Sequence, residues 1–225
     1  MTASPAALGY QVKFETLNLG GLDYHIRSLL DKQQYSDPDG SAERAGITSA
    51  IWPLFGQVWP SSRILAGVMQ TFAIEGKRIL EIGSGLALAS LVMQRRGADI
   101  TASDCHPLAA AFLVENLLLN HMAAIPFQTG NWSDADPALG KFDLIIGSDV
   151  LYERSQPDIL SRFIDRHSNP EVEVIIVDPD RGNRAKFNRD MVDLGYSHSE
   201  QRAAHHQNSG EPYKGRILNY QRGVG

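Results

Sequence analysis

The sequence has little cysteine and no long apolar run. Its one cysteine, Cys105, can form neither an internal disulfide nor a cysteine metal cage, which is typical of proteins in a reducing compartment. No stretch approaches the ~20 apolar residues that a membrane helix needs. Residues 1–9 contain neither a basic residue nor an apolar core, so we expect no secretory signal and no transit peptide. These absences predict a cytoplasmic protein without a membrane partner.

The chain also lacks an excess of positive charge. It carries 21 Lys and Arg against 26 Asp and Glu, with a formal net charge of −5 and an isoelectric point near 5.8. This balance disfavours nucleic acid as a partner, although a local basic patch remains compatible with it. With 225 residues we expect one domain, in which residues 1–50 are an N-terminal extension and residues 51–225 form the main fold. The oligomeric state stays open.

From residue 77 onward, short apolar runs alternate with helix-length amphipathic segments. This is the pattern of a parallel sheet with helices on both faces. Helices are expected at 61–72, 86–97 and 107–120 and after the fourth and fifth strands. The expected strands are 78–82, 100–103, 125–128, 143–147 and 172–177, then two antiparallel strands at 196–201 and 215–221. The sequence therefore predicts an α/β fold with a seven-stranded, mainly parallel, Rossmann-like sheet.

The first fifty residues have a different pattern. Apolar residues within Val12–Ile26 flank a Gly20-Gly21 turn signal, which predicts a β-hairpin. Residues 36–41, Ser-Asp-Pro-Asp-Gly-Ser, form a loop by composition. The pair Ser61-Ser62 is a candidate cap for the helix that follows.

A glycine-rich turn follows the first strand of the expected sheet, in the sequence Glu81-Ile-Gly83-Ser84-Gly85-Leu-Ala87-Leu88. Glycines at a strand-to-helix turn let the backbone approach a ligand closely. A dinucleotide site would have a third glycine where Leu88 stands. The acidic residue two positions before Gly83, with a small residue at 87, instead fits the pattern of S-adenosylmethionine sites. The loop therefore favours this cofactor over NAD.

Asp104 stands at the end of the second strand, twenty-one residues after Gly83. A carboxylate at this place can accept two hydrogen bonds from ribose hydroxyls. The same spacing occurs in NAD enzymes. It therefore supports an adenosine cofactor in general, and only the sequence of the glycine loop distinguishes S-adenosylmethionine from NAD.

The segment Gly147-Ser148-Asp149-Val-Leu-Tyr152-Glu153 resembles the Asp-x-x-Tyr motif of one group of seven-strand (class I) protein-lysine methyltransferases. The same group has a Trp-Pro or similar pair before its first helix, and this sequence has Trp59-Pro60 at that place. It further has an acidic or amide residue followed by tryptophan after the third strand, here Asn131-Trp132. With the hairpin, the resemblance covers roughly residues 10 to 220.

The resemblance implies a role for each matching position. Residues 51–225 would be the S-adenosylmethionine-binding domain, with a protein as the methyl acceptor. Asp149 and Tyr152 would face the acceptor. Two positions depart from the family pattern, since Ala87 replaces the commoner glycine and Asn131 the commoner aspartate. The cofactor would contact the backbone cradle Gly83, Ser84 and Gly85, Glu81 at the strand end, the ribose ligand Asp104, the adenine neighbour Trp132, and Trp59 and Ser148 along its sides.

Lysine methylation needs a neutral amine. Holding a lysine of pKa near 10.4 neutral at pH 7 costs about 4–5 kcal/mol. A nearby carboxylate such as Asp149 favours the ammonium, so we assign it acceptor positioning. Methylation of RNA or of a small molecule, a non-catalytic adenosyl-cofactor-binding protein and an NAD-dependent oxidoreductase stay as alternatives. His205-His206 have no third ligand at a telling spacing, so no metal site is predicted.

Overall fold

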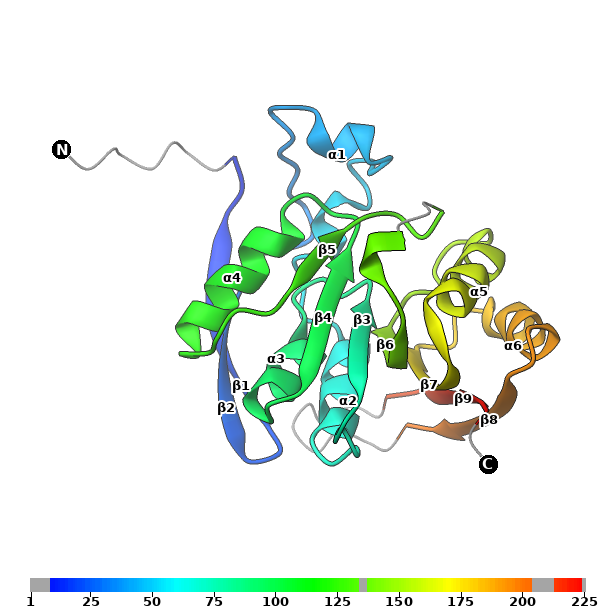
Figure 1. The fold of residues 1–225 in the computed structure, drawn as a ribbon. Helices are drawn as coiled ribbons and strands as arrows, with labels where there is room; N and C mark the ends of the chain where they lie inside the picture. Colours follow the sequence, from blue (N-terminus) through cyan, green and yellow to red (C-terminus); the bar gives the residue numbers. More distant parts are fainter. Residues whose placement is uncertain (1–8, 134–136, 204–212, 224–225) are drawn as a thin grey trace.

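The computed structural model describes residues 9–133, 137–203 and 213–223. Seven strands form one sheet in the order β5-β4-β3-β6-β7-β9-β8 (Figure 1). The first five in this order are parallel, whereas β9 runs antiparallel to both β7 and β8. This arrangement confirms the predicted seven-stranded, mainly parallel sheet. The strands are β3 (Arg78–Ile82), β4 (Asp99–Asp104), β5 (Phe127–Thr129), β6 (Phe142–Ser148), β7 (Ser168–Asp178), β8 (Ser197–Arg202) and β9 (Arg216–Arg222).

Helices cover both faces of the sheet because successive residues of its strands point to opposite sides. Ile79 of β3 lies in a core with α2, α3 and α4, whereas Leu80, the next residue, lies in a second core with α5 and α6. Short apolar runs buried on both faces are typical of parallel strands. The helices are α2 (Pro60–Met69), α3 (Leu88–Arg95), α4 (Ala109–Leu119), α5 (Gln156–His167) and α6 (Arg184–Asp193), with the short α1 (Ser41–Arg44), η1 (Trp52–Leu54) and η2 (Pro137–Leu139).

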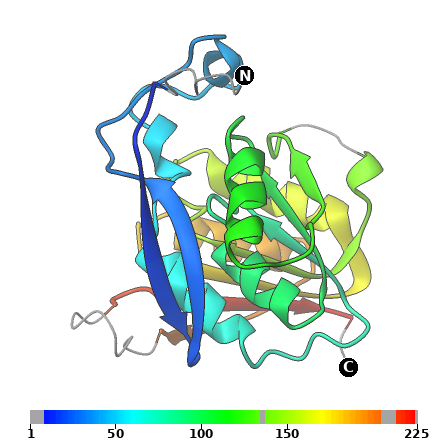
Figure 2. The same cartoon turned by 90° about the vertical axis from the view of Figure 1, so that its left-hand side faces the viewer.

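The predicted hairpin is confirmed as β1 (Val12–Leu19) and β2 (Leu22–Leu29), paired antiparallel as a separate two-stranded sheet. It stands beside α4 (Figure 2). A side chain of α4 and that of its C-cap residue hold the hairpin: the backbone N–H groups of Arg27 and His25 donate to the amide oxygens of Asn116 and Asn120, at 2.7 and 2.8 Å. The hairpin thus packs on the helix layer. The domain boundary at residue 50 stays a prediction.

Two helix starts differ from the sequence prediction. The helix α2 begins at Pro60 with extended Trp59 as its N-cap, so Ser61-Ser62 lie inside the first turn and do not cap it. Proline suits the first helical position, where its missing N–H leaves no bond unmade. The helix α4 begins at Ala109 and not at Pro107.

The third strand starts two residues later than predicted, at Phe127, after Pro126, whose ring nitrogen has no proton for strand pairing. Within the expected loop 36–41, Ser41 starts α1, which composition did not predict. Residues 1–8 and the histidines at 205 and 206 lie outside the described residues. Among the helices that the structure describes, none combines the length and the apolar character needed to cross a membrane.

Candidate functional site

The carboxyl ends of four parallel strands meet at one edge of the sheet. Ile82 at the end of β3 is level with Ser103 of β4 and with Gly147 of β6, and Ser148 is level with Val177 of β7. The chain order reverses between β3 and β6, since β4 and β5 lie on one side of β3 and β6 on the other. Ligands of open α/β sheets bind at such a reversal, outside the carboxyl ends of the strands. The loops after β3, β4, β6 and β7 therefore form the candidate site.

The loop after β3 requires both of its glycines. Gly83 and Gly85 have φ angles of 55° and 52°, in the left-handed region that favours glycine. A Cβ on Gly83 would lie 2.9 Å from Val150 Cγ1, and one on Gly85 would lie 2.8 Å from the carbonyl oxygen of Phe55. The hydroxyl of Ser84, between them, is buried and has no hydrogen-bond partner among the described residues. The loop is thus a tight backbone cradle with an unused polar group.

Glu81 points away from this cradle, into the start of α3. Its carboxylate accepts hydrogen bonds from the backbone N–H of Ser90, at 2.8 Å, and from the Ser90 hydroxyl. Burial raises the pKa of Glu81 to about 7, against the effect of the Ser90 hydrogen bonds. The structure therefore gives Glu81 the task of holding α3 against β3. Direct contact of Glu81 with a cofactor stays a prediction.

Asp104 ties β4 to the glycine loop. One carboxylate oxygen accepts from the backbone N–H of Gly85 and the other from that of His106, both at 2.8 Å. Burial raises the pKa of this carboxyl, and the backbone hydrogen bonds act against that rise. The carboxylate also accepts from the backbone N–H of Cys105, which leaves a lone pair that a ribose hydroxyl can use. The predicted ribose ligand thus also fixes the position of the cradle.

His106 belongs to the site although the sequence reading did not single it out. Its ring stacks on Phe55, with centroids 3.7 Å apart and planes 14° apart, and meets Trp52 edge to face. Burial lowers the pKa of His106 to about 4, so the ring is neutral at physiological pH. It holds Phe55, whose carbonyl covers Gly85. No local pattern signals this role, because Phe55 lies about fifty positions away in the chain.

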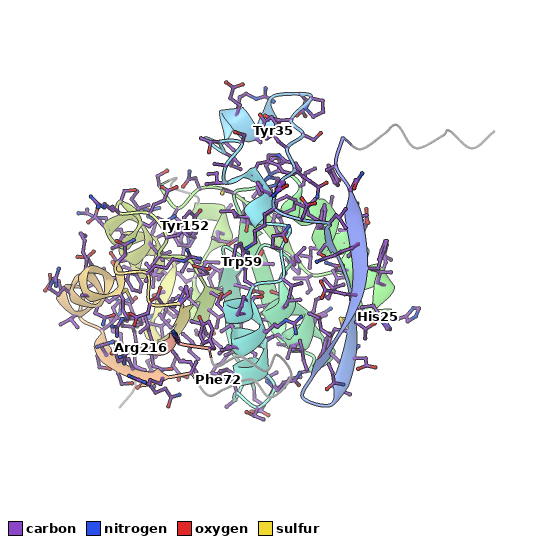
Figure 3. The ribbon with its side chains drawn as sticks, turned by 180° about the vertical axis from the view of Figure 1, so that it is seen from behind. His25, Tyr35, Trp59, Phe72, Tyr152 and Arg216 are labelled. Atoms are coloured by element: carbon purple, nitrogen blue, oxygen red, sulfur yellow. The ribbon has the colours of Figure 1, made fainter. Side chains whose placement is uncertain are left out.

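The predicted tryptophans have different surroundings. Trp132 lies against Gly83, since its Cζ2 atom is 3.4 Å from the place of a Cβ there. Trp59 donates its indole N–H to the carbonyl of Leu54 at 2.9 Å, and Lys32 Nζ lies 4.1 Å above its ring. Trp59 and Tyr152 lie between Tyr35, at the end of the molecule that carries α1, and Phe72, which follows the end of α2 (Figure 3). Only Trp132 is thus brought directly to the glycine loop.

The loop after β6 carries the predicted acceptor residues. Asp149 has a φ of 55°, uncommon for a residue with a side chain, and its backbone N–H donates to the carbonyl of Val177 at 2.9 Å. Its carboxylate forms a two-pronged ion pair with Arg181, at 2.7 and 2.8 Å. Arg181, in the loop after β7, was missed by sequence reasoning. Ser148, the last residue of β6, precedes this turn.

Tyr152 is partly open to solvent, with 42% of its surface exposed. Desolvation of its hydroxyl, with a smaller contribution from the neighbouring Cys105, raises the pKa of Tyr152 to about 12. Burial likewise raises the pKa of the Cys105 thiol to about 12. Both groups are therefore protonated at neutral pH. Tyr152 is available as a hydrogen-bond donor, and Cys105 is unsuited to act as a nucleophile.

The described residues contain no cluster of metal-ligating side chains. Across residues 9–133, 137–203 and 213–223, no three His, Cys, Asp or Glu side chains form a group that could hold a metal ion. The predicted absence of a metal site at His205-His206 lies outside these ranges.

Comparison with known proteins gives one family. A family model described as lysine methyltransferase matches residues 43–191. The chain is 29% identical over 143 residues to the electron transfer flavoprotein beta subunit lysine methyltransferase of Mus musculus, which covers 62% of this chain and 55% of that protein. It is 26% identical over 140 residues to the protein N-lysine methyltransferase METTL21A of Xenopus tropicalis, which covers 59% of this chain and 62% of that protein. The chain thus spans little more than half the length of these curated relatives.

Solved structures share the fold. The 16S rRNA N2 G1207 methyltransferase of T. Thermophilus, in complex with AdoMet and guanosine, superposes with a TM-score of 0.63 at 15% identity. The superposition covers 94% of this chain and 51% of the other. At this identity the likeness concerns the fold alone.

Proposed function

This chain belongs to the lysine methyltransferase family, and from that premise we propose that it transfers a methyl group from S-adenosylmethionine to a lysine side chain of a protein. The site has a cofactor half, formed by the loops after β3 and β4, and an acceptor half, formed by the loops after β6 and β7. The observation that supports the proposal most directly is the contact between these two halves. Gly83 lies so close to Val150 that a Cβ would meet its side chain at 2.9 Å. The Asp149–Tyr152 segment therefore starts directly beside the glycine cradle.

The residues of the cofactor half fit S-adenosylmethionine. A side chain would not fit at Gly83 or at Gly85, and the Ser84 hydroxyl between them is buried without a partner among the described residues. Asp104 keeps a lone pair for the ribose, and Trp132 offers a flat apolar wall for the adenine. When bound, this cofactor supplies an electrophilic methyl group on a sulfonium. We propose Trp59, Glu81 and Ser148 as further lining residues, with Glu81 acting through α3.

The acceptor half fits an amine. Asp149 attracts the lysine ammonium and orients it, and the Tyr152 hydroxyl limits the space around the nitrogen. The ammonium first loses its proton to solvent. The neutral amine would then take the methyl group that the bound cofactor would supply, with the C–S bond electrons left on sulfur, so that a methylammonium and a thioether would result. Holding the neutral amine within reach of that methyl group would be the main catalytic task of Asp149 and Tyr152.

The test follows the transfer of tritium from labelled S-adenosylmethionine to components of a cell extract. The purified protein is incubated with the labelled cofactor and the extract, and the product is then treated with protease, treated with nuclease or desalted. We expect label that protease alone removes. Asp149→Ala should abolish it, while the matched control Asp158→Ala should keep it, since Asp158 forms an exposed pair with Arg162 on α5.

Three outcomes contradict the proposal. Label that nuclease removes indicates RNA methylation, and label lost on desalting indicates a small acceptor. Saturable cofactor binding without any label indicates a non-catalytic binding protein. Since the balance of charge and the family both favour protein, we expect none of these. A cytoplasmic location also stays a proposal, checked by fractionation of the host cell.

A further inference from the structure

The loop after β7 reaches across to the acceptor residues. Arg181 donates from Nε and Nη2 to the two carboxylate oxygens of Asp149, at 2.7 and 2.8 Å. The arginine side chain is 44% exposed and that of the aspartate 12%. Asp149 thus already has a cationic partner that contacts it with two parallel bonds, the strongest geometry for such a pair. Each oxygen still has a lone pair for an incoming amine.

The backbone around Arg181 is held on both sides. Asp180 has a φ of 70° and donates its N–H to a carboxylate oxygen of Asp178 at 2.9 Å. Asn183 donates from its side-chain amide to the carbonyls of Leu151 and Glu153, at 2.8 and 3.1 Å. These two carbonyls flank Tyr152. The loop therefore fastens the whole acceptor segment, and its anchors favour an Arg181 that stays in place when substrate enters.

Arg181 lies where it can offset an unfavourable effect of Asp149 on the protonation of the acceptor amine. A lone carboxylate beside the acceptor favours the ammonium form, which has no lone pair for the methyl group. A guanidinium bound to that carboxylate cancels most of its field and itself disfavours a second positive charge. Resting on the proposed function, we propose that Arg181 stays paired with Asp149 during methyl transfer and acts as a positioning residue that keeps the acceptor amine neutral and nucleophilic.

Among the charged groups around this pair, Arg181 is the one that neutralises the Asp149 carboxylate. Arg184 faces Asp180 and Glu200, and so does not reach Asp149. Burial raises the pKa of Asp178 and also that of Tyr213, which keeps Tyr213 uncharged at neutral pH. The titratable groups that act on this pair are Asp178 and Tyr213, with Asp180 and Arg184 next to Asp178. Glu153 and Asp104 act on the neighbouring Tyr152. Since carboxylates outnumber the cations here, removing Arg181 leaves the amine among carboxylates.

The experiment is a pH profile. Full-length wild type, Arg181→Met and Arg181→Lys label extract protein from tritiated S-adenosylmethionine between pH 6.5 and 10, with cofactor binding measured on each variant to confirm folding. For Arg181→Met, we expect the half-maximal pH to rise by about one unit, so label at pH 7 falls about tenfold and recovers at high pH. Arg181→Lys should restore most of the wild-type profile. The matched control Arg162→Met, which breaks the exposed pair on α5, should leave the profile unchanged.

Two results overturn the inference alone. If Arg181→Met loses label by the same factor at every pH, the residue is merely structural. If label at pH 7 rises, Arg181 competes with the substrate and leaves the carboxylate when lysine binds. If wild type itself gives no protein label, the proposed function fails and this inference fails with it.

Discussion

The two halves of the site are built differently. On the cofactor half, the Asp104 carboxylate accepts a hydrogen bond from the Gly85 backbone N–H, and close contacts leave no room for a Cβ at Gly83 or Gly85. On the acceptor half, Asp149 and Tyr152 lie partly in solvent and depend on Arg181 and Asn183 from the next loop. The cofactor half is thus rigid and local, whereas the acceptor half is assembled from two loops. This difference suits an invariant cofactor beside an acceptor that has to enter and leave.

The largest effect is expected from Gly85→Ala. The added Cβ would lie 2.8 Å from the backbone carbonyl of Phe55, and the φ of 52° is unfavourable for alanine. We expect the affinity for S-adenosylmethionine, measured by titration calorimetry, to fall about 100-fold or more, since overpacking costs about 1–3 kcal/mol and left-handed strain adds to it.

The control for this change is Gly97→Ala. Gly97 also has a positive φ, of 76°, but nothing lies within 4 Å of its Cβ position. It should lose about 1 kcal/mol of stability through backbone strain and keep its cofactor affinity. Equal losses of affinity in both variants would contradict the role of the close approach to Phe55.

A smaller effect, on turnover alone, is expected from Asp149→Asn. The amide offers one acceptor oxygen in place of two, so it cannot hold Arg181 and the acceptor nitrogen together, and misplacement of the amine by about 1 Å costs about 100-fold in rate. Methyl transfer should fall by about this factor while the dissociation constant for S-adenosylmethionine stays within about twofold. A parallel loss of cofactor affinity would show that the two halves are not separable.

The third effect concerns pH and stability. Glu81 has a pKa of about 7 in the fold, against about 4.3 in an unfolded chain. Between these values the fold keeps a proton that the unfolded chain releases, so stability from this group is present below about pH 4.3 and is lost as pH rises to about 7.

Glu81→Gln replaces the carboxyl with an amide that does not ionise, so the variant lacks this pH-dependent loss of stability. In urea unfolding, the difference in unfolding free energy between wild type and variant should change by about 3 kcal/mol from pH 4.5 to pH 7.5, with wild type losing more. If the two proteins respond to pH in parallel, Glu81 is already ionised at pH 4.5 in the fold.

The smallest effect is expected from Trp59→Phe. The change removes the indole N–H that donates to the Leu54 carbonyl at 2.9 Å and keeps an aromatic ring for Lys32. Loss of one such hydrogen bond costs about 1 kcal/mol, so thermal unfolding should shift by a few degrees. Since the phenyl ring keeps an aromatic wall, a tenfold loss of cofactor affinity would contradict this result and show that the cofactor surface needs the indole itself.

The same difference between the halves explains what the sequence could predict. The strands, the glycine loop and Asp104 are visible in the sequence because alternating apolar runs fix the strands and each site residue directly follows a strand end. Asp149 is visible for the same reason. Arg181 and Asn183 are not, because their partners lie 32 positions earlier in the chain and no local pattern joins the two loops.

Two further details depended on packing. Glu81 fits a cofactor pattern by sequence, yet its side chain turns to Ser90, a choice that the facing helix makes. Ser61-Ser62 look like a helix cap, but Pro60 starts the helix one residue earlier. The cap prediction was therefore wrong, and in both cases the partner of the side chain was decided by neighbours that periodicity does not specify.

The central claim is that the acceptor is a lysine nitrogen beside Asp149. The most direct test hydrolyses the protein labelled from tritiated S-adenosylmethionine to amino acids and separates them by chromatography. We expect the label to elute with methylated lysine, and this peak to fall about 100-fold in Asp149→Asn. Label that elutes with methylated arginine or histidine, or a methyl-lysine peak that persists in Asp149→Asn, would contradict it.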